Sequence, residues 1–311
     1  MTAFRSGVST VGPMTNQDRT IPPAANTSRA KPIKARKLRA RRIGFDYPQG
    51  GLERHYVDND LVMSHVTSML SAMFPEGEAF FVRSVRHYND DITDPELKSQ
   101  VAGFVGQEIT HGREHRNINE RLQEMGFPTR YVDRSTRRQL AVAEYVLPHS
   151  ISLAVTAALE HYTATLAGFL LTSPEARALI TSDEVRAMLL WHAYEEVEHK
   201  AVAFDVYRHT GGSEFLRIAT MRVVTFTSVL GLVWTTALSL LRDRAAYSPR
   251  TLFRSVAQLR HGPWASRQVL LDLRKYNKRG FHPDDIDTTD LLEQWRTELF
   301  GDKGALVDHL K

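Results

Sequence analysis

Apolar residues recur at intervals of three and four along four stretches of the chain, as on one side of a helix of about 3.6 residues per turn. These stretches cover residues 58–88, 94–125, 148–172 and 182–209. No competing stretch shows the strict alternation of apolar and polar residues that is typical of a half-buried strand. The pattern therefore predicts an all-α fold.

Turn and capping residues place the helix boundaries. Pro75 predicts that a helix restarts within the first stretch, and Asp94 before Pro95 predicts an N-cap. The link between the second and third stretches, about residues 126–147, is much longer than the other two links. A bundle with one long crossover has this topology, so we expect a ferritin-like four-helix bundle.

Two of the predicted helices carry a glutamate and a histidine three residues apart, Glu108 with His111 and Glu196 with His199. Residues with this spacing share one face of a helix. The carboxylate can then bridge two metal ions while the imidazole binds one of them. In ferritin-like di-metal bundles, two such helices are joined by one glutamate from each of two others.

Glu160 is the only charged side chain between Ser150 and Ser173. A carboxylate in the middle of an apolar helix is costly unless it is protonated, hydrogen-bonded or bound to a cation. A protonated or hydrogen-bonded core glutamate is one alternative. We prefer a metal ligand, because the two Glu-x-x-His helices need such a partner.

The fourth carboxylate must come from the first helical stretch, which offers Glu76 and Glu78. We prefer Glu78, because Glu76 lies in the first turn after Pro75 and can serve there to complement the helix dipole. Four glutamates and two divalent cations give a neutral centre that can lie in a core. The chain has no cysteine, and oxygen and imidazole ligands suit iron, with manganese or zinc as alternatives.

Two further histidines, His115 and His192, lie on the ligand faces of the two Glu-x-x-His helices. Each is a candidate catalytic proton donor, a further ligand, or a group that holds a ligand carboxylate in place. Glu195 is expected beside the ligands or at the surface. Glu198 is expected to face solvent.

The positive charge of the chain is concentrated at its start. Residues 1–44 hold ten Lys and Arg and one acid, so the rest of the chain has thirty cations and thirty-five acids. We expect a disordered basic arm over 1–44, the di-metal bundle over 45–215, and a helical extension over 216–311 that packs on the bundle. No aromatic residue interleaves the cations of 29–42, so no nucleic acid is expected. The start has no apolar run of a secretory signal, and we expect a cytoplasmic protein.

Residues 223–241 form a stretch of nineteen residues without a charge. That length could span a bilayer. A helix that covers the bundle is the preferred interpretation, and a peripheral membrane contact, made together with the basic arm, is the alternative. Formation of a homodimer is left open.

Five segments in order resemble the bacterial family usually labelled predicted metal-dependent hydrolase, whose motifs are similar to those of ferritin-like di-iron proteins. The segments are "FPEGEAFFVRSVRHY", "FVGQEITHGREHRNIN", "TAALEHYT", "WHAYEEVEHKAVAFDVY" and "GFHPDD". The resemblance covers roughly residues 33–295 and implies a helical metal-binding protein. It would make ligands of Glu78, Glu108, His111, Glu160, Glu196 and His199.

The six-ligand pattern is similar to that of oxygen-activating di-iron enzymes. It predicts two divalent ions, preferably iron, in an oxidase or oxygenase that acts on a small apolar or lipid-like substrate and takes electrons from a partner protein. The alternative is a metal-dependent hydrolase with a metal-activated water, in which His115 or His192 handles the proton. A third interpretation is a non-catalytic iron-binding protein.

Overall fold

The computed structural model describes residues 33–259 and 266–311, which belong to one compact unit. Within these ranges the regular structure is helical, with two isolated bridges, Ile43 with Leu310 and Val57 with Ile180. The all-α prediction is confirmed for this part of the chain. In chain order the α-helices are α1 (Leu61–Arg86), α2 (Pro95–Glu124), α3 (Thr129–Val146), α4 (His149–Thr172), α5 (Pro174–Ala178), α6 (Asp183–His199), α7 (Val202–His209), α8 (Glu214–Leu240), α9 (Pro249–Leu259), α10 (Arg267–Lys275) and α11 (Thr289–Phe300), and short 3-10 helices cover Arg244–Tyr247, Pro283–Asp285 and Val307–His309.

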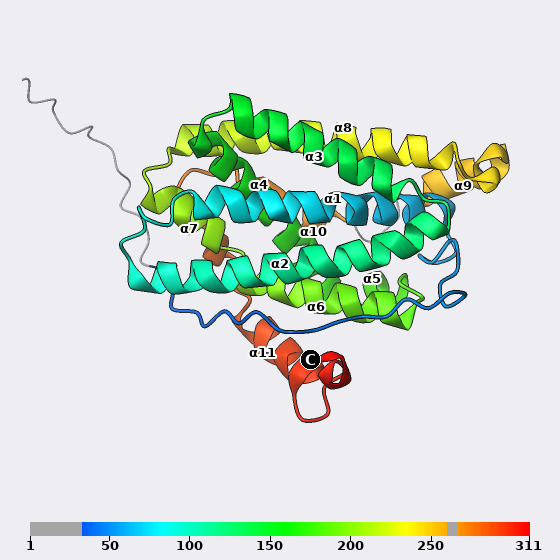
Figure 1. The fold of residues 1–311 in the computed structure, drawn as a ribbon, viewed down its shortest axis with the longest axis horizontal. Coiled ribbons are helices and arrows are strands. Elements are labelled where there is room, and N and C mark those ends of the chain that lie inside the picture. The colour runs from blue at the N-terminus through cyan, green and yellow to red at the C-terminus, as the bar shows by residue number, and fades with distance from the viewer. Residues whose placement is uncertain (1–32, 260–265) are drawn as a thin grey trace, which may run out of the picture. The chain divides into compact units, whose positions relative to one another are not determined.

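Four of these helices surround the centre of the described unit. α1 packs against α2 and α4, and α6 packs against the same two helices from the other side (Figure 1). Buried apolar side chains form one cluster that includes Met69 and Trp191 and a second that includes Phe81 and Phe104. Histidines of the central helices contact both clusters, because the His111 ring lies 5.0 Å from Trp191 and the His199 ring lies 5.0 Å from Phe104.

α1 continues through Pro75, contrary to the restart predicted at this residue. A proline has no N–H, so the carbonyl of Ser71, four residues earlier, loses its helical partner. Asn119 of α2 replaces it, because its Nδ2 donates to the Ser71 carbonyl at 2.8 Å. The Asn119 side chain from α2 thus satisfies the carbonyl that Pro75 leaves free, so that α1 can continue through the proline.

Two other predicted boundaries differ from the structure. The link over 126–147 contains a helix of its own, α3, which packs along α1. The stretch 182–209 is divided into α6 and α7 at Lys200 and Ala201. Lys200 is buried and its Nζ donates to the Thr288 hydroxyl at 2.8 Å, so this corner is held by the chain after α10.

The last part of the predicted basic arm lies against the helices. Arg36 pairs with Asp284, Ile43 is fully buried, and the backbone N–H of Phe45 donates to Glu114 of α2 at 3.1 Å. The segment 33–44 runs alongside α2 and α6 (Figure 1). The remainder of the arm, 1–32, lies outside the described residues.

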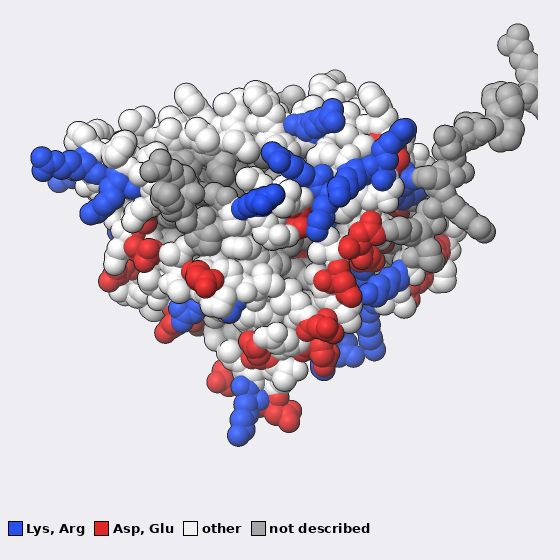
Figure 2. Space-filling view, turned by 180° about the vertical axis from the view of Figure 1, so that it is seen from behind, with Lys and Arg blue, Asp and Glu red and all other residues white. Residues whose placement is uncertain are grey.

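The chain after residue 213 adds helices around this arrangement. α8 lies across α1 and α4, α9 contacts α1, and α11 contacts α6. α8 includes most of the uncharged stretch 223–241 and forms part of the upper edge in Figure 1. Figure 2 shows the same edge from behind, with few charged atoms along it.

Candidate metal centre

Six side chains from the four central helices point into one buried region. Each of them is at most 3% exposed. All six were predicted from the sequence to be metal ligands, and the structure brings them together. They are Glu78 of α1, Glu108 and His111 of α2, Glu160 of α4, and Glu196 and His199 of α6.

His199 lies at the meeting point of three carboxylates. Its Nε2 is 3.1 Å from Glu108 Oε1, 3.3 Å from Glu160 Oε2 and 3.7 Å from Glu196 Oε2. Each of the three glutamates comes from a different helix. The contacts therefore tie α2, α4 and α6 together at one point.

His111 makes a second meeting point beside the first. Its Nδ1 is 3.5 Å from Glu196 Oε1 and 3.8 Å from Glu108 Oε1. The two oxygens of Glu196 thus face different histidines. Ligand atoms within 4.8 Å of one another form two separate groups, Glu78, His111 and His192 in one and Glu108, Glu196 and His199 in the other.

Many of these polar atoms are buried and make no hydrogen bond of good geometry among the described residues, although His199 Nε2 lies 3.1 Å from Glu108 Oε1 and 3.3 Å from Glu160 Oε2. Buried polar atoms in folded proteins are nearly always hydrogen-bonded, so a concentration of exceptions indicates that cations belong there. The donor set, carboxylate oxygens and imidazole nitrogens, fits divalent metal ions. The atoms are both carboxylate oxygens of Glu78, Glu108 and Glu160, Oε2 of Glu196, Nδ1 of His111 and Nε2 of His199.

The electrostatics of the protein alone show the cost of this arrangement. Burial, together with the charges of Glu108 and Glu196, raises the pKa of Glu160 to about 8. Burial and the charge of Glu108 raise the pKa of Glu78 as well. The pKa of His199 is raised although burial opposes it, because Glu160 and Glu108 favour the charged ring. Without metal ions, bound protons must supply the positive charge that balances the buried carboxylates.

The other ring nitrogen of each histidine is held by a hydrogen bond. His111 Nε2 lies 3.0 Å from Glu195 Oε2, and His199 Nδ1 lies 2.9 Å from Gln107 Oε1. A donated N–H at these atoms leaves the opposite nitrogen of each ring with its lone pair directed at the carboxylates. Such partners orient metal-binding histidines.

Arg41, from the segment before α1, completes this support. Its guanidinium donates to Glu195 at 2.7 Å and to Glu198 at 3.0 Å. Glu198 therefore does not face solvent, contrary to expectation, and it also accepts a hydrogen bond from Gln107 Nε2 at 2.7 Å. Neither Arg41 nor Gln107 was predicted from the sequence to belong to the site. The Gln107 position, four residues before His111, was a usable signal, whereas no spacing links Arg41 to the site.

His115 and His192 lie together at one end of the cluster. His192 Nε2 is 2.8 Å from Glu196 Oε1 and 3.7 Å from Glu78 Oε1, and its Nδ1 is 2.8 Å from His115 Nε2. His115 Nδ1 is 2.9 Å from the Ser71 hydroxyl. His192 thus touches the carboxylates, and His115 reaches them only through His192.

Glu76, the alternative to Glu78, and His282, in the segment "GFHPDD", lie outside the cluster. Glu76 pairs with Arg137 of α3 at 2.8 Å and has Arg116 at 3.8 Å, so the preference for Glu78 agrees with the geometry. His282 lies 2.8 Å from Asp205 and caps a short 3-10 helix. Both residues have structural partners.

A third group of potential ligands, His55, His65 and Asp243, lies elsewhere in the unit. Both histidine Nε2 atoms and Arg54 Nε converge on one oxygen, Asp243 Oδ2, at 3.1, 3.2 and 2.8 Å. The guanidinium already neutralises this carboxylate and would repel a cation. The group is a structural network.

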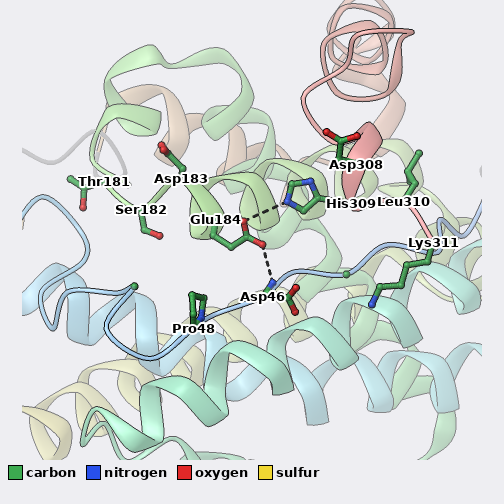
Figure 3. Close-up of a pocket in the computed structure, with 12 residues that line it drawn as sticks. Asp46, Pro48, Thr181, Ser182, Asp183, Glu184, Asp308, His309, Leu310 and Lys311 are labelled. Atoms are coloured by element: carbon green, nitrogen blue, oxygen red, sulfur yellow. Dashed lines mark hydrogen bonds and ion pairs between the residues drawn. The ribbon is translucent and has the colours of Figure 1, made fainter.

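Two pockets among the described residues are lined by none of the six ligand candidates. The pocket in Figure 3, of about 800 Å³, is lined by residues of the N-terminal segment, the start of α6 and the chain end. Glu184 in this pocket precedes Glu196 by twelve residues on α6, which is about 18 Å along a helix. A second pocket of about 330 Å³ includes His161, Val197 and Lys200 but none of the six.

Comparison with known proteins gives one match. Residues 39–287 match the family model described as "Predicted metal-dependent hydrolase". No curated protein and no solved structure matches the chain. The family corrects the prediction of an oxygen-activating oxidase, since it points to the hydrolytic alternative. The similarity of the ligand pattern to di-iron oxidases misled because the same ligands can support both chemistries.

Proposed function

The chain belongs to the family of predicted metal-dependent hydrolases, and on this premise we propose that it hydrolyses a small-molecule substrate at a dinuclear metal centre. The ligands proposed are Glu78, Glu108, His111, Glu160, Glu196 and His199. They would be held by a ferritin-like four-helix bundle made of α1, α2, α4 and α6. The observation that carries the proposal is the set of buried carboxylate and imidazole atoms without hydrogen-bond partners among the described residues.

Charge and grouping support two cations rather than one. The four glutamates carry four negative charges when ionised, which two divalent ions balance. Five of the six proposed ligands fall into two groups, and the sixth, Glu160, contacts His199 of the second group. Glu196 directs one oxygen to a histidine of each group. Iron, manganese and zinc all accept such ligands. We propose iron first, with manganese or zinc as alternatives.

Divalent ions bound here would lower the pKa of a coordinated water and polarise the substrate oxygen. The protein's own contribution begins with orientation. Glu195 and Gln107 each hold one imidazole by the nitrogen that faces away from the carboxylates. Arg41 fixes Glu195 in turn, so the ligand rings are set before any cation arrives.

We propose His192 and His115 as the groups that move the proton of the reaction. His192 Nε2 lies against Glu196, where it can accept a proton. His192 Nδ1 then faces His115 Nε2, and His115 Nδ1 faces the Ser71 hydroxyl. The Ser71 hydroxyl donates to Asn119 Oδ1 at 2.8 Å. A continuous row of hydrogen bonds thus leads away from the carboxylates.

Two variants of the same helix test the proposal. The protein is stripped of metal and reloaded with Fe(II), Mn(II) or Zn(II), metal content is measured, and p-nitrophenyl carboxylate and phosphate esters are offered. We expect about two ions per chain, ester cleavage only after loading, and loss of both in Glu78→Gln. Glu76→Gln is the matched control, because Glu76 lies two residues away and contacts arginines instead.

Two outcomes would overturn the proposal. If Glu78→Gln kept the metal content and activity of the wild type, the assigned centre would be wrong. If metal bound as proposed but neither ester class was cleaved with any of the three metals, the hydrolytic assignment would be wrong.

A further inference from the structure

One side of α8 is apolar and exposed. Val223, Phe226, Leu230, Val233 and Trp234 are all more than half exposed, with Trp234 at 62%. Their spacing of three and four residues puts them on one stripe of the helix. Within its most hydrophobic window only 22% of the residues are buried, although the helix is long and apolar enough to cross a membrane.

The opposite side of α8 is committed to the protein. Met221, Val224, Thr235 and Ser239 are buried, and α8 packs on α1 and α4. Tyr162 of α4 donates to the hydroxyl of Thr225 at 2.6 Å. A helix held along its length in this way lies on the bundle and does not leave it to span a bilayer.

α9 extends the apolar surface. Ser255 is buried and receives the backbone N–H of Val62 at 2.8 Å, and its own hydroxyl donates to Asp60 at 2.6 Å. The helix is therefore fixed to the start of α1 by its polar side. Phe253, 76% exposed, and Val256 project from the helix.

The exposed charged residues between residues 215 and 259 are all positive. Between residues 215 and 259 the sequence has a single acid, Asp243, which is buried and paired with Arg54. Five arginines of this segment are exposed. They are Arg222 within α8, Arg242 and Arg244 just after it, and Arg250 and Arg254 on α9. Figure 2 shows the uncharged edge with basic groups at its left end, where α9 lies.

We propose that the exposed side of α8 and α9, here called the docking face, binds the surface of an anionic lipid bilayer. Its Phe, Trp and Val side chains would enter the boundary between head groups and acyl chains, while the arginines contact anionic head groups. An apolar stripe that is flanked by basic residues is the composition of an interfacial helix. The proposal does not depend on the hydrolytic function.

Charge argues against a second copy as the occupant. In a symmetric dimer the same surface of both chains meets, and antiparallel pairing of two α8 helices would bring the arginines of one end against those of the other. No exposed acid between residues 215 and 259 is available to compensate. Anionic lipid supplies the missing negative charge.

Vesicle flotation with the full chain tests the docking face. We expect binding to vesicles of phosphatidylcholine with 30% phosphatidylglycerol, and at least tenfold weaker binding to phosphatidylcholine alone, the composition being chosen to give about one anionic lipid in three. Val233→Asp should weaken binding at least tenfold. Tyr145→Asp is the matched control, because Tyr145 is 91% exposed on α3, and it should bind as the wild type does.

Trp234 provides a second measurement that does not depend on flotation. Its emission should shift to shorter wavelength and be quenched by brominated lipid when anionic vesicles are added. In Trp234→Phe the shift should disappear while flotation is retained to within about threefold, because a phenylalanine keeps the apolar contact.

Several results would overturn the proposal. Equal binding of Val233→Asp and wild type would show that the basic arm, not the docking face, holds the vesicle. A dimer in sedimentation equilibrium that Val233→Asp dissociates, with no vesicle binding, would identify a second copy as the occupant. Resistance to carbonate extraction would identify a spanning helix. Glu78→Gln should float as the wild type does, so failure here is distinguishable from failure of the metal centre.

Discussion

Glu160 Oε2 lies 3.3 Å from His199 Nε2. The two residues come from different helices, α4 and α6, and both side chains are at most 1% exposed. An isolated ionised carboxylate at such a depth would be too costly to keep. Glu160, the one acid of its apolar helix, thus contacts the pair Glu196 and His199 directly. It is linked to the second Glu-x-x-His pair through His199, which also contacts Glu108.

Replacing Glu160 should have opposite effects with and without metal. In metal-free protein at pH 8.5, above the raised pKa of Glu160 of about 8, Glu160→Gln removes a buried negative charge and should increase the free energy of unfolding by up to about 5 kcal/mol. In metal-loaded protein the same change removes a ligand and should lower the melting temperature. Calorimetry of both forms checks this. Destabilisation of the metal-free form would show that Glu160 has another structural partner.

The hydrogen bond that His111 Nε2 donates to Glu195 should control metal affinity. Glu195→Gln removes the negative charge that faces His111 Nε2, so that the hydrogen bond from the ring becomes weaker. It also removes the ion pair with Arg41. We expect metal affinity to fall roughly 10- to 100-fold, as for other residues that orient metal ligands. Competition with a chelating dye measures the change, and an unaltered affinity would contradict the role given to Glu195.

Two glycines on neighbouring helices should respond differently to alanine. A Cβ at Gly77 would have no neighbour within 4 Å, whereas a Cβ at Gly112 would lie 3.1 Å from Glu78 Oε2. Gly77→Ala should therefore stabilise α1 by about 0.5–1 kcal/mol without changing metal affinity. Gly112→Ala should displace Glu78 and weaken metal binding. Equal affinity in both variants would show that Glu78 has room to move.

The stability of the protein should depend on pH through His65. Burial lowers the pKa of His65 to about 4, although Asp243 opposes the shift. The neutral ring is favoured in the folded protein, so its contribution is complete above the unfolded pKa of about 6.5 and is lost as the pH falls from there through about 4. The loss should reach about 3 kcal/mol.

Urea unfolding at several pH values tests the role of His65. His65→Gln should reduce the change in the free energy of unfolding between pH 6.5 and 4, because glutamine does not titrate in that range. Metal content must be kept constant across the series. A variant with the same slope as the wild type would assign the pH dependence to other groups.

The sequence predicted the residues of the candidate site better than the elements that support it. Glu160 was informative because its helix contains no other charge, and the Glu-x-x-His spacing placed two ligands on one face without any tertiary information. The continuity of α1 through Pro75 could not be predicted in this way, because it depends on Asn119 from another helix. The same holds for the division between α6 and α7, where Lys200 donates a hydrogen bond to Thr288, 88 positions later in the chain.

The N-terminal segment shows the same limit. Composition assigned Arg41 to a solvated arm, since eight cations lie within fourteen residues. Its guanidinium pairs with Glu195 and Glu198, which are remote in the sequence. Its Cζ also lies 4.9 Å from the centre of the Tyr194 ring. Charge pattern alone cannot distinguish a cation in solvent from one with a buried partner.

The close fit of residues 38–40 on α2 gives this segment an unexpected sensitivity. A Cβ at Gly103 would lie 2.5 Å from Leu38 Cβ, and one at Gly106 would lie 2.6 Å from Ala40 Cβ. A single methyl group at Gly103 or Gly106 would push residues 38–40 away from α2 and draw Arg41 away from Glu195. The absence of a side chain at Gly103 and Gly106 thus allows the Arg41 guanidinium to reach Glu195, which orients the His111 ring.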